Sequence, residues 1–314
     1  MKRHRHHLFF AAAISVTLLV LLQYQTQVLG EDESEAVRAP VAAAERLPSF
    51  NPPEPDPVPT LTSRLEDADR LLAEERWIAA RDLLSDGLTA ADAIDPEVRS
   101  RLERISDLTF FSRRYVPGDP FTGTYTVQPG DSLERIVRRL DLAVDWRLLQ
   151  RVNGLRDASH VRFGQQLKVV RGPFHVRVDK SEFRADVFAG PVDEPERWIY
   201  VRSFPVGLGS GGLTPVGTFV VKDGGKVVDP FWTDPRSGNW YGPGDPQNPI
   251  GDRWIGLEGV GEYAALQGYG FHGTLEPESV GGEGSLGCIR LLPDDVGRLY
   301  ELLGEGRSVI EIRP

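Results

Sequence analysis

The sequence has little of what nucleic-acid binding or disulfide stabilisation would require. Its 36 Lys and Arg residues are outnumbered by 46 Asp and Glu, which gives a formal net charge of -10 at pH 7. Phosphate binding depends on a positive surface, so we expect no nucleic-acid partner. Cys288 is the single cysteine among 314 residues, and no disulfide can form within the chain. Stability must therefore come from packing, and the length predicts two or three small domains.

Long apolar runs are also scarce, with one exception near the N-terminus. The run from Leu8 to Leu22 follows the basic residues Lys2, Arg3 and Arg5. It is shorter than the roughly 20 residues that span a bilayer comfortably, so a cleaved signal peptide and an uncleaved signal anchor both fit residues 1–30. We favour the anchor. Both alternatives deliver the rest of the chain outside the cytoplasm, to the periplasm or cell wall, with membrane contact through this segment alone.

A proline-rich linker and a helical segment follow. Residues 31–60 include five prolines between Pro52 and Pro59, which favours an extended spacer. Residues 61–116 have helical periodicity, and Asp95 followed by Pro96 predicts the start of a helix. We interpret residues 61–112 either as a docking site for a protein partner or as a packing spacer.

Residues 124–171 form a compact strand-helix-helix-strand pattern. Tyr125-Thr-Val127 predicts a strand, Asp131 with Glu134 predicts a capping box that opens a helix, and Asp145 predicts the cap of a second helix. A strand from Leu167 to Val170 closes the unit. This order, with Tyr-Thr-Val-Gln-Pro-Gly-Asp-Ser-Leu at its front, resembles a LysM domain. The resemblance implies a small α+β fold that binds polymers containing N-acetylglucosamine.

From residue 173 to 314 the pattern is mainly β. Phe174, Val176 and Val178 alternate with other residues, as strands do, and Pro293 to Leu303 predicts the one helix of this region. The expected architecture is therefore a mainly β domain preceded by a small α+β domain and a short helical segment.

The lone cysteine has neighbours suited to nucleophilic chemistry. His272 lies sixteen positions before Cys288, and two strands joined by a loop of that length can bring an imidazole beside a thiol. An imidazole can remove the thiol proton, and the backbone N–H groups of Gly287 and Cys288 are candidate donors to an oxyanion. A buried, inert cysteine with a core histidine is the alternative that these residues alone leave open.

The wider motif resembles the YkuD family of L,D-transpeptidases. Phe-His272-Gly-Thr and Ser285-Leu-Gly-Cys288-Ile-Arg290-Leu carry the resemblance, together with Thr214-Pro-Val-Gly-Thr-Phe219 and the segment from Gly244 to Ile255. It implies a YkuD-like β-sandwich with Cys288 as the acylated nucleophile, His272 as its base and the carbonyl of Gly273 as the group that orients the imidazole. Leu286 stands where one variant of the family has a second histidine.

Substrate-binding residues are also expected near this motif. Arg290 either holds a substrate carboxylate or forms a salt bridge with a nearby acid. The further candidates are Ser285, Tyr269 and Trp254, and Trp232, Trp240 and Tyr241 are aromatic residues that either line the groove or pack in the core. His272 lacks the close ligand spacing of a zinc site, so we expect neither a metal nor a cofactor.

The family resemblance implies acyl transfer on peptidoglycan tetrapeptide stems, with release of D-alanine. An amine acceptor on a second stem would give a 3-3 cross-link, and an acceptor on a protein would attach that protein to the wall. Two alternatives stay open: a carboxypeptidase that uses water at the same site, and a catalytically degenerate wall-binding protein that acts through the LysM-like unit.

Overall fold

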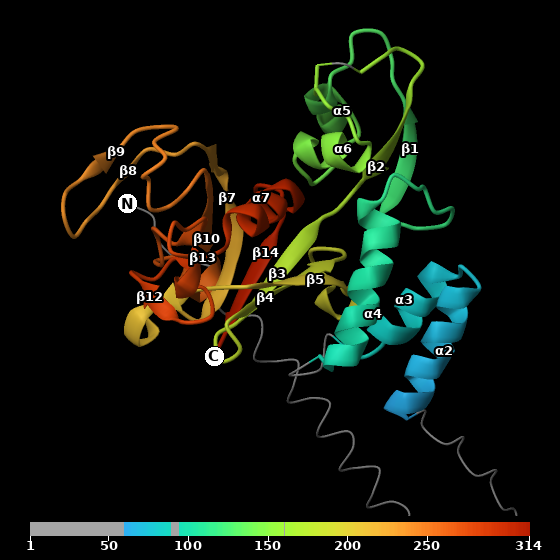
Figure 1. Ribbon diagram of the computed structural model, residues 1–314, viewed down its shortest axis with the longest axis horizontal. Coiled ribbons are helices and arrows are strands. Elements are labelled where there is room, and N and C mark those ends of the chain that lie inside the picture. The colour runs from blue at the N-terminus through green and yellow to red at the C-terminus, as the bar shows by residue number, and fades with distance from the viewer. Residues whose placement is uncertain (1–59, 89–93, 160) are drawn as a thin grey trace, which may run out of the picture. The chain divides into compact units, whose positions relative to one another are not determined.

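A computed structural model describes residues 60–88, 94–159 and 161–314. The predicted signal or anchor lies outside the described residues, as does all of the predicted linker except Thr60. Within the described part of the chain, no helix combines the length and apolar character needed to cross a membrane. The expected fold class is confirmed, because a mainly β domain follows a small α+β unit and a helical segment (Figure 1).

Three helices form the N-terminal segment, and two of them begin at a residue whose side chain caps the first turn. Thr60 and Asp95 accept hydrogen bonds from backbone N–H groups in the first turns of their helices, and Pro96 occupies the first helical position as predicted. The helices are α2 (Leu61–Ala73), α3 (Trp77–Ser85) and α4 (Pro96–Ser106), and a π-helical turn, η2 (Asp107–Phe111), extends α4.

These helices pack on the β domain. Phe188, Trp198 and Tyr200 of the sheet belong to the same buried cluster as the helix residues. Glu103 of α4 accepts hydrogen bonds from the Tyr200 hydroxyl at 2.8 Å and the Ser203 backbone N–H at 3.0 Å. The structure therefore gives the helical segment a packing role, and a protein partner for it stays a prediction.

The LysM-like unit has the predicted strand-helix-helix-strand order. Its elements are β1 (Thr122–Thr126), α5 (Leu133–Arg139), α6 (Trp146–Val152) and β2 (Gln166–Val170), with β1 and β2 antiparallel. The predicted capping box was wrong by one residue, because Ser132 caps α5. Asp131 instead accepts hydrogen bonds from the Tyr125 hydroxyl and the Gln128 backbone N–H, and these bonds hold the turn before the helix.

One curled sheet of eight strands organises the β domain (Figure 1). Its strand order is β13-β11-β10-β7-β14-β3-β4-β5, and all neighbours are antiparallel except β11 with β13 and β14 with β3. The strands and helices of the domain are β3 (Phe174–Asp179), β4 (Arg184–Ala189), η3 (Pro195–Arg197), β5 (Ile199–Pro205), β6 (Leu208–Gly209), η4 (Ser210–Gly212), β7 (Gly217–Val228), β8 (Trp232–Thr233), β9 (Trp240–Tyr241), β10 (Arg253–Gly259), η5 (Gly261–Tyr263), β11 (Gly270–His272), η6 (Pro277–Ser279), β12 (Glu283–Ser285), β13 (Ile289–Arg290), α7 (Pro293–Leu302) and β14 (Val309–Arg313).

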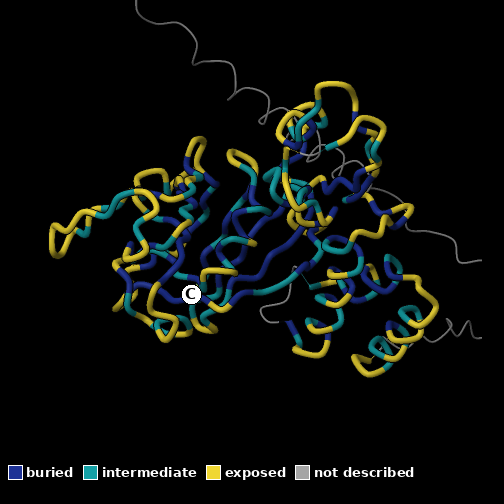
Figure 2. Tube along the Cα trace, turned by 45° about the horizontal axis from the view of Figure 1, so that its top comes forward, coloured by how far each residue is buried: buried dark blue, intermediate teal, exposed yellow. Residues whose placement is uncertain are grey.

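Both faces of the sheet are covered at β3, where Figure 2 shows buried backbone at the centre of the fold. Phe174, Val176 and Val178 belong to the large core cluster, as their alternation predicts. His175 and Arg177, which point to the other face, are buried too. A strand with two covered faces loses the polar alternation of a half-exposed strand.

His175 is held as a neutral imidazole in this second face. Its Nδ1 accepts a hydrogen bond from the Val309 backbone N–H at 3.1 Å, and its Nε2 lies 2.9 Å from the Gly190 carbonyl oxygen. Trp198 stacks on the ring at 4.1 Å. Because Nδ1 accepts this hydrogen bond, a proton on Nδ1 would face the Val309 N–H, and the imidazole stays singly protonated. Burial lowers the pKa of His175 to about 4.

We expect His175 to make the protein less stable in acid. Between pH 6.5 and 4 the unfolded chain binds a proton at this residue and the folded chain does not, so about 3 kcal/mol of unfolding free energy is lost as the pH falls through this range. His175→Gln can donate and accept as the neutral ring does, without titrating. In urea unfolding at several pH values, the free energy of unfolding of this variant should fall less with decreasing pH than that of the wild type. An unchanged pH slope would contradict the assignment.

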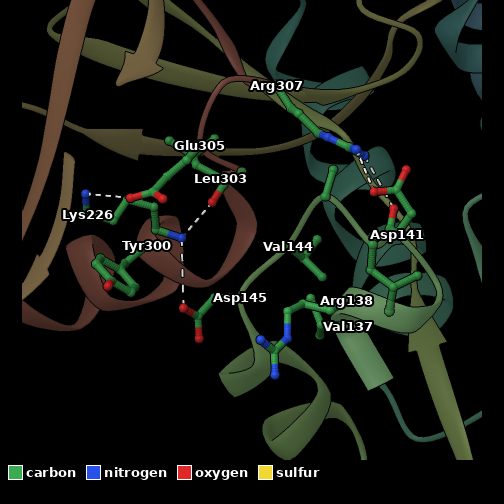
Figure 3. Close-up of a pocket in the computed structure, with 13 residues that line it drawn as sticks. Val137, Arg138, Asp141, Val144, Asp145, Lys226, Tyr300, Leu303, Glu305 and Arg307 are labelled. Carbon is green, nitrogen blue, oxygen red and sulfur yellow. Dashed lines mark hydrogen bonds and ion pairs between the residues drawn. The ribbon is translucent and has the colours of Figure 1, made fainter. Parts of the chain in front are cut away.

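A polar cavity of about 450 Å³ lies where the LysM-like unit meets the β domain (Figure 3). Lys226 of β7 donates a hydrogen bond to the Leu303 carbonyl at 2.6 Å, and its amine lies 4.0 Å from the Asp145 carboxylate. Arg307 pairs with Asp141 across the same boundary. The buried core is also continuous from Leu148 and Val169 to Phe174 and Leu299. The two units therefore share a core as well as polar contacts.

Candidate active site

Two short strands bring the motif residues together. The strand β11 ends at His272, and β13 begins directly after Cys288. The pair is parallel, with Phe271 opposite Ile289 and His272 opposite Arg290. The loop between them returns the chain to the same edge of the sheet, so His272 and Cys288 line one cavity although sixteen positions separate them.

A cavity of about 350 Å³ opens at this edge of the sheet. Cys288, His272, Ser285, Arg290 and Trp254, all predicted from sequence, are among its lining residues. The other lining residues come from the β8–β9 hairpin and from neighbouring loops: Trp232, Asp234, Pro235, Arg236, Pro249, Ile250, Gly268, Glu276 and Leu286. The structure thus gathers most of the predicted site around one cavity.

The His272 imidazole is fixed by its surroundings. Its Nδ1 lies 2.6 Å from the carbonyl oxygen of Gly273, so Nδ1 carries the proton and Nε2 keeps its lone pair. Trp254, opposite it on β10, stacks on the ring at 6.0 Å. Burial, with a smaller contribution from the positive charge of Arg290, lowers the pKa of His272 to about 4 against the opposing effect of the hydrogen bond to Gly273. At neutral pH the ring is an uncharged base.

The Cys288 thiol is also uncharged in this state. Burial raises its pKa, outweighing a backbone hydrogen bond from Gly270 and the charge of Arg290, which both lower it. The Sγ donates to the Gly268 carbonyl oxygen at 3.7 Å. A neutral thiol and a neutral imidazole therefore face one cavity, and a thiolate requires proton transfer to a base.

A hydrogen-bonded turn holds the backbone before Cys288. The Ser285 Oγ donates to the Cys288 carbonyl at 2.6 Å and accepts from the Gly287 N–H at 3.1 Å. Gly287 has φ of +122°, and a Cβ there would lie 2.9 Å from both the Leu213 carbonyl oxygen and the Tyr269 ring. Only glycine fits this position without strain. Because its N–H is already bonded to Ser285, Gly287 is not free to bind an oxyanion in this conformation.

Thr214 supports the same turn, and sequence reasoning gave it no role in the site. Its hydroxyl donates to the Gly287 carbonyl at 3.0 Å and accepts from the Gly209 N–H at 2.8 Å. Thr214 opens the Thr-Pro-Val-Gly-Thr-Phe motif, so the motif carried a signal for this residue. The segment before Cys288 is also held by the sheet, because β12 pairs with β6.

Other predicted substrate residues divide into two groups. Arg290 lines the cavity and forms a salt bridge of 3.1 Å with Glu276, and its binding of a substrate carboxylate stays a prediction. Trp232 lines the cavity and stacks on Tyr241. Tyr269 lies outside the lining, where its ring packs beside Gly287 and Phe219. Trp240 is 65% exposed on the hairpin and is not a lining residue.

Comparison with known proteins identifies the family. A family model described as the YkuD L,D-transpeptidase catalytic domain matches residues 173–312, and a LysM domain model matches residues 125–170. The YkuD protein of Bacillus licheniformis, which is named as an L,D-transpeptidase, is 30% identical over 195 residues. That match covers 59% of this chain and 96% of the relative. The chain belongs to the YkuD family of L,D-transpeptidases. Both resemblances predicted from the motifs are confirmed.

Other YkuD-family relatives match over shorter stretches. The Bacillus subtilis protein YqjB, also named as an L,D-transpeptidase, is 41% identical over 98 residues, or 31% of this chain. The match covers 51% of YqjB, so the chain spans about half the length of this relative. An L,D-transpeptidase structure from Mycobacterium smegmatis aligns over 48% of this chain and 64% of its own, with 18% identity and a TM-score of 0.33. At this TM-score the superposition adds nothing to the assignment.

Proposed function

We propose that this YkuD-family protein is a peptidoglycan L,D-transpeptidase that transfers an acyl group through Cys288, outside the cytoplasm. The observation that carries the proposal is the shared cavity of Cys288 and His272, in which the bond from His272 to the Gly273 carbonyl leaves Nε2 as the basic nitrogen. An imidazole in this tautomer can accept the thiol proton.

The acylation step follows from this arrangement. As His272 Nε2 takes the thiol proton, Sγ attacks the carbonyl that joins the third residue of a tetrapeptide stem to its terminal D-alanine. The C–N bond breaks, the proton passes from His272 to the departing amine, and D-alanine leaves behind a thioester on Cys288. The Cys288 N–H, next to the turn held by Ser285 and Thr214, is our candidate donor to the oxyanion.

The second step transfers the acyl group to an amine. The acceptor nitrogen attacks the thioester and loses a proton to His272, and Sγ leaves and is reprotonated by the same imidazole. A side-chain amine of another stem gives a 3-3 cross-link, and an amine on a protein gives wall attachment. Water at this step would make the protein an L,D-carboxypeptidase.

The LysM domain supports peptidoglycan as the polymer. We propose that it binds the glycan strand while the catalytic domain acts on stem peptides, which places the protein in the periplasm or the cell wall. The competing proposal, a degenerate wall-binding protein, accounts for the LysM domain but leaves unexplained why a cysteine and an oriented histidine line one cavity.

Product analysis tests the proposal. Purified protein is incubated with disaccharide tetrapeptide, and the products are separated and weighed by mass spectrometry. A cross-linked dimer with release of D-alanine supports transpeptidation, whereas a tripeptide product alone supports the carboxypeptidase. If neither product forms while the protein still sediments with insoluble peptidoglycan, the degenerate wall-binding protein is the better description.

A further inference from the structure

The β8–β9 hairpin brings an arginine to the mouth of the active-site cavity. Trp232 and Tyr241 stack across the hairpin, and the segment that connects its strands contributes Asp234, Pro235 and Arg236 to the cavity lining. Arg236 thus reaches the cavity that contains Cys288 from an element outside the catalytic motifs. The proposed acyl transfer assigns no role to this arginine.

Hydrogen bonds within the hairpin fix the backbone of Arg236. Asp234 accepts from the Arg236 N–H at 2.9 Å and from the Ser237 hydroxyl at 2.8 Å. The Gly238 N–H donates to the Asp234 carbonyl at 2.8 Å. These bonds lower the pKa of Asp234, so its carboxylate stays ionised and is engaged within the turn.

The cavity therefore contains two guanidinium groups in different situations. Arg290 donates to the Glu276 carboxylate at 3.1 Å. Among the residues that the structure describes, the Arg236 side chain has no hydrogen-bond acceptor or ion-pair partner, although its charge acts on the nearby Asp234 carboxylate. The formal charges of Asp234, Glu276, Arg236 and Arg290 cancel. Any preference for an anion must then come from guanidinium donors that no acceptor occupies, and Arg236 has more of these than Arg290, whose Nη1 is bonded to Glu276.

The proposed donor substrate carries a carboxylate that must enter this cavity. In a tetrapeptide stem a single carbon separates the scissile nitrogen from the carboxylate of the terminal D-alanine. When Cys288 reaches the scissile carbonyl, this carboxylate is necessarily near the cavity wall. A guanidinium can bind a carboxylate through two parallel hydrogen bonds, which lysine cannot reproduce.

We propose that Arg236 determines donor specificity by binding the C-terminal carboxylate of the tetrapeptide stem. This inference rests on the proposed function. It assigns to the hairpin the selection of donors that end in a free D-alanine carboxylate at the fourth position.

The test crosses enzyme variants with substrate variants. We expect Arg236→Ala to lower kcat/KM for the free-acid tetrapeptide by about 10- to 100-fold, the range for a lost hydrogen bond to a charged group. The same variant should leave kcat/KM for the C-terminal carboxamide nearly unchanged. For the free-acid tetrapeptide, kcat/KM of Arg236→Lys should lie between the values of the wild type and Arg236→Ala. Arg197→Ala, an exposed arginine paired with Glu194 away from the cavity, is the matched control.

Three outcomes would overturn the inference. If Arg236→Ala lowers kcat/KM equally for the free acid and the carboxamide, Arg236 is a structural residue of the hairpin. If kcat/KM falls for neither substrate, Arg236 has no role in donor binding. A loss that disappears when a side-chain carboxylate of the third residue is amidated would identify that group as the ligand instead.

A binding experiment separates this inference from the proposed function. On a Cys288→Ala background, isothermal titration of the tetrapeptide and of its carboxamide needs no turnover. The acid should bind more tightly than the carboxamide, and Arg236→Ala should remove the difference. Equal affinities would contradict the role of Arg236 even if the enzyme is an active transpeptidase. A clear difference would support it even if turnover is absent.

Discussion

Cys288→Ala is expected to lower D-alanine release from tetrapeptide stems by about 10⁴-fold or more, because the variant has no atom that can form the thioester. The cavity and its cations remain, so substrate affinity should change little. The measurement is the initial rate of D-alanine release, with mass spectrometry of the intact protein to detect the acyl-enzyme. An acyl adduct should appear on the wild type and be absent from the variant.

His272→Gln provides a matched comparison for the base. Glutamine can still donate to the Gly273 carbonyl but cannot take the thiol proton, so we expect a loss of about 10² to 10⁴-fold. Thermal unfolding of both variants controls for folding. D-alanine release that persists at the wild-type rate in Cys288→Ala would rule out this cysteine as the nucleophile.

Trp198→Ala should lower the free energy of unfolding by about 3 to 5 kcal/mol, the usual cost of removing a buried large aromatic side chain. The indole is 2% exposed, stacks on His175 and donates from Nε1 to the Pro191 carbonyl at 2.7 Å. It also belongs to the cluster that joins the helices to the sheet. Urea unfolding followed by circular dichroism at neutral pH measures the change.

Trp240→Ala is the control for this stability prediction. Trp240 is 65% exposed at the β8–β9 hairpin, and its loss should change the free energy of unfolding by less than about 0.5 kcal/mol. A similar loss of unfolding free energy in both variants would mean that the burial of Trp198 does not account for its contribution to stability. Because Trp198 covers His175, its removal should also admit water and raise the pKa of His175.

Much of the fold followed from local signals in the sequence. Pro96 after Asp95 fixes the start of α4, and Asp145 caps α6 as expected. Asp131 and Ser132 are both good caps, and sequence alone did not show that Asp131 would bond to Tyr125. The burial of His175 could not be predicted either, since alternation along β3 does not reveal that the Trp198 and Phe188 rings cover its second face.

The candidate site was predictable where neighbouring strands determine it. The Cys288 and His272 motifs lie on paired strands, and their spacing was informative. Thr214 opens a recognised motif that did not show where its side chain lies, and Arg236 enters the cavity from a hairpin that is distant in sequence. The bond between Ser285 and Gly287 depends on the conformation of one turn, which motif resemblance does not specify.

The raised pKa of Cys288 also bears on the oxidation of this unpaired thiol. Peroxides and disulfides react with thiolates far faster than with thiols. A cysteine that stays protonated at neutral pH is therefore protected from sulfenic acid formation and from mixed disulfides, even in an oxidising compartment. The same burial that disfavours the Cys288 thiolate keeps this unpaired thiol in its less reactive form.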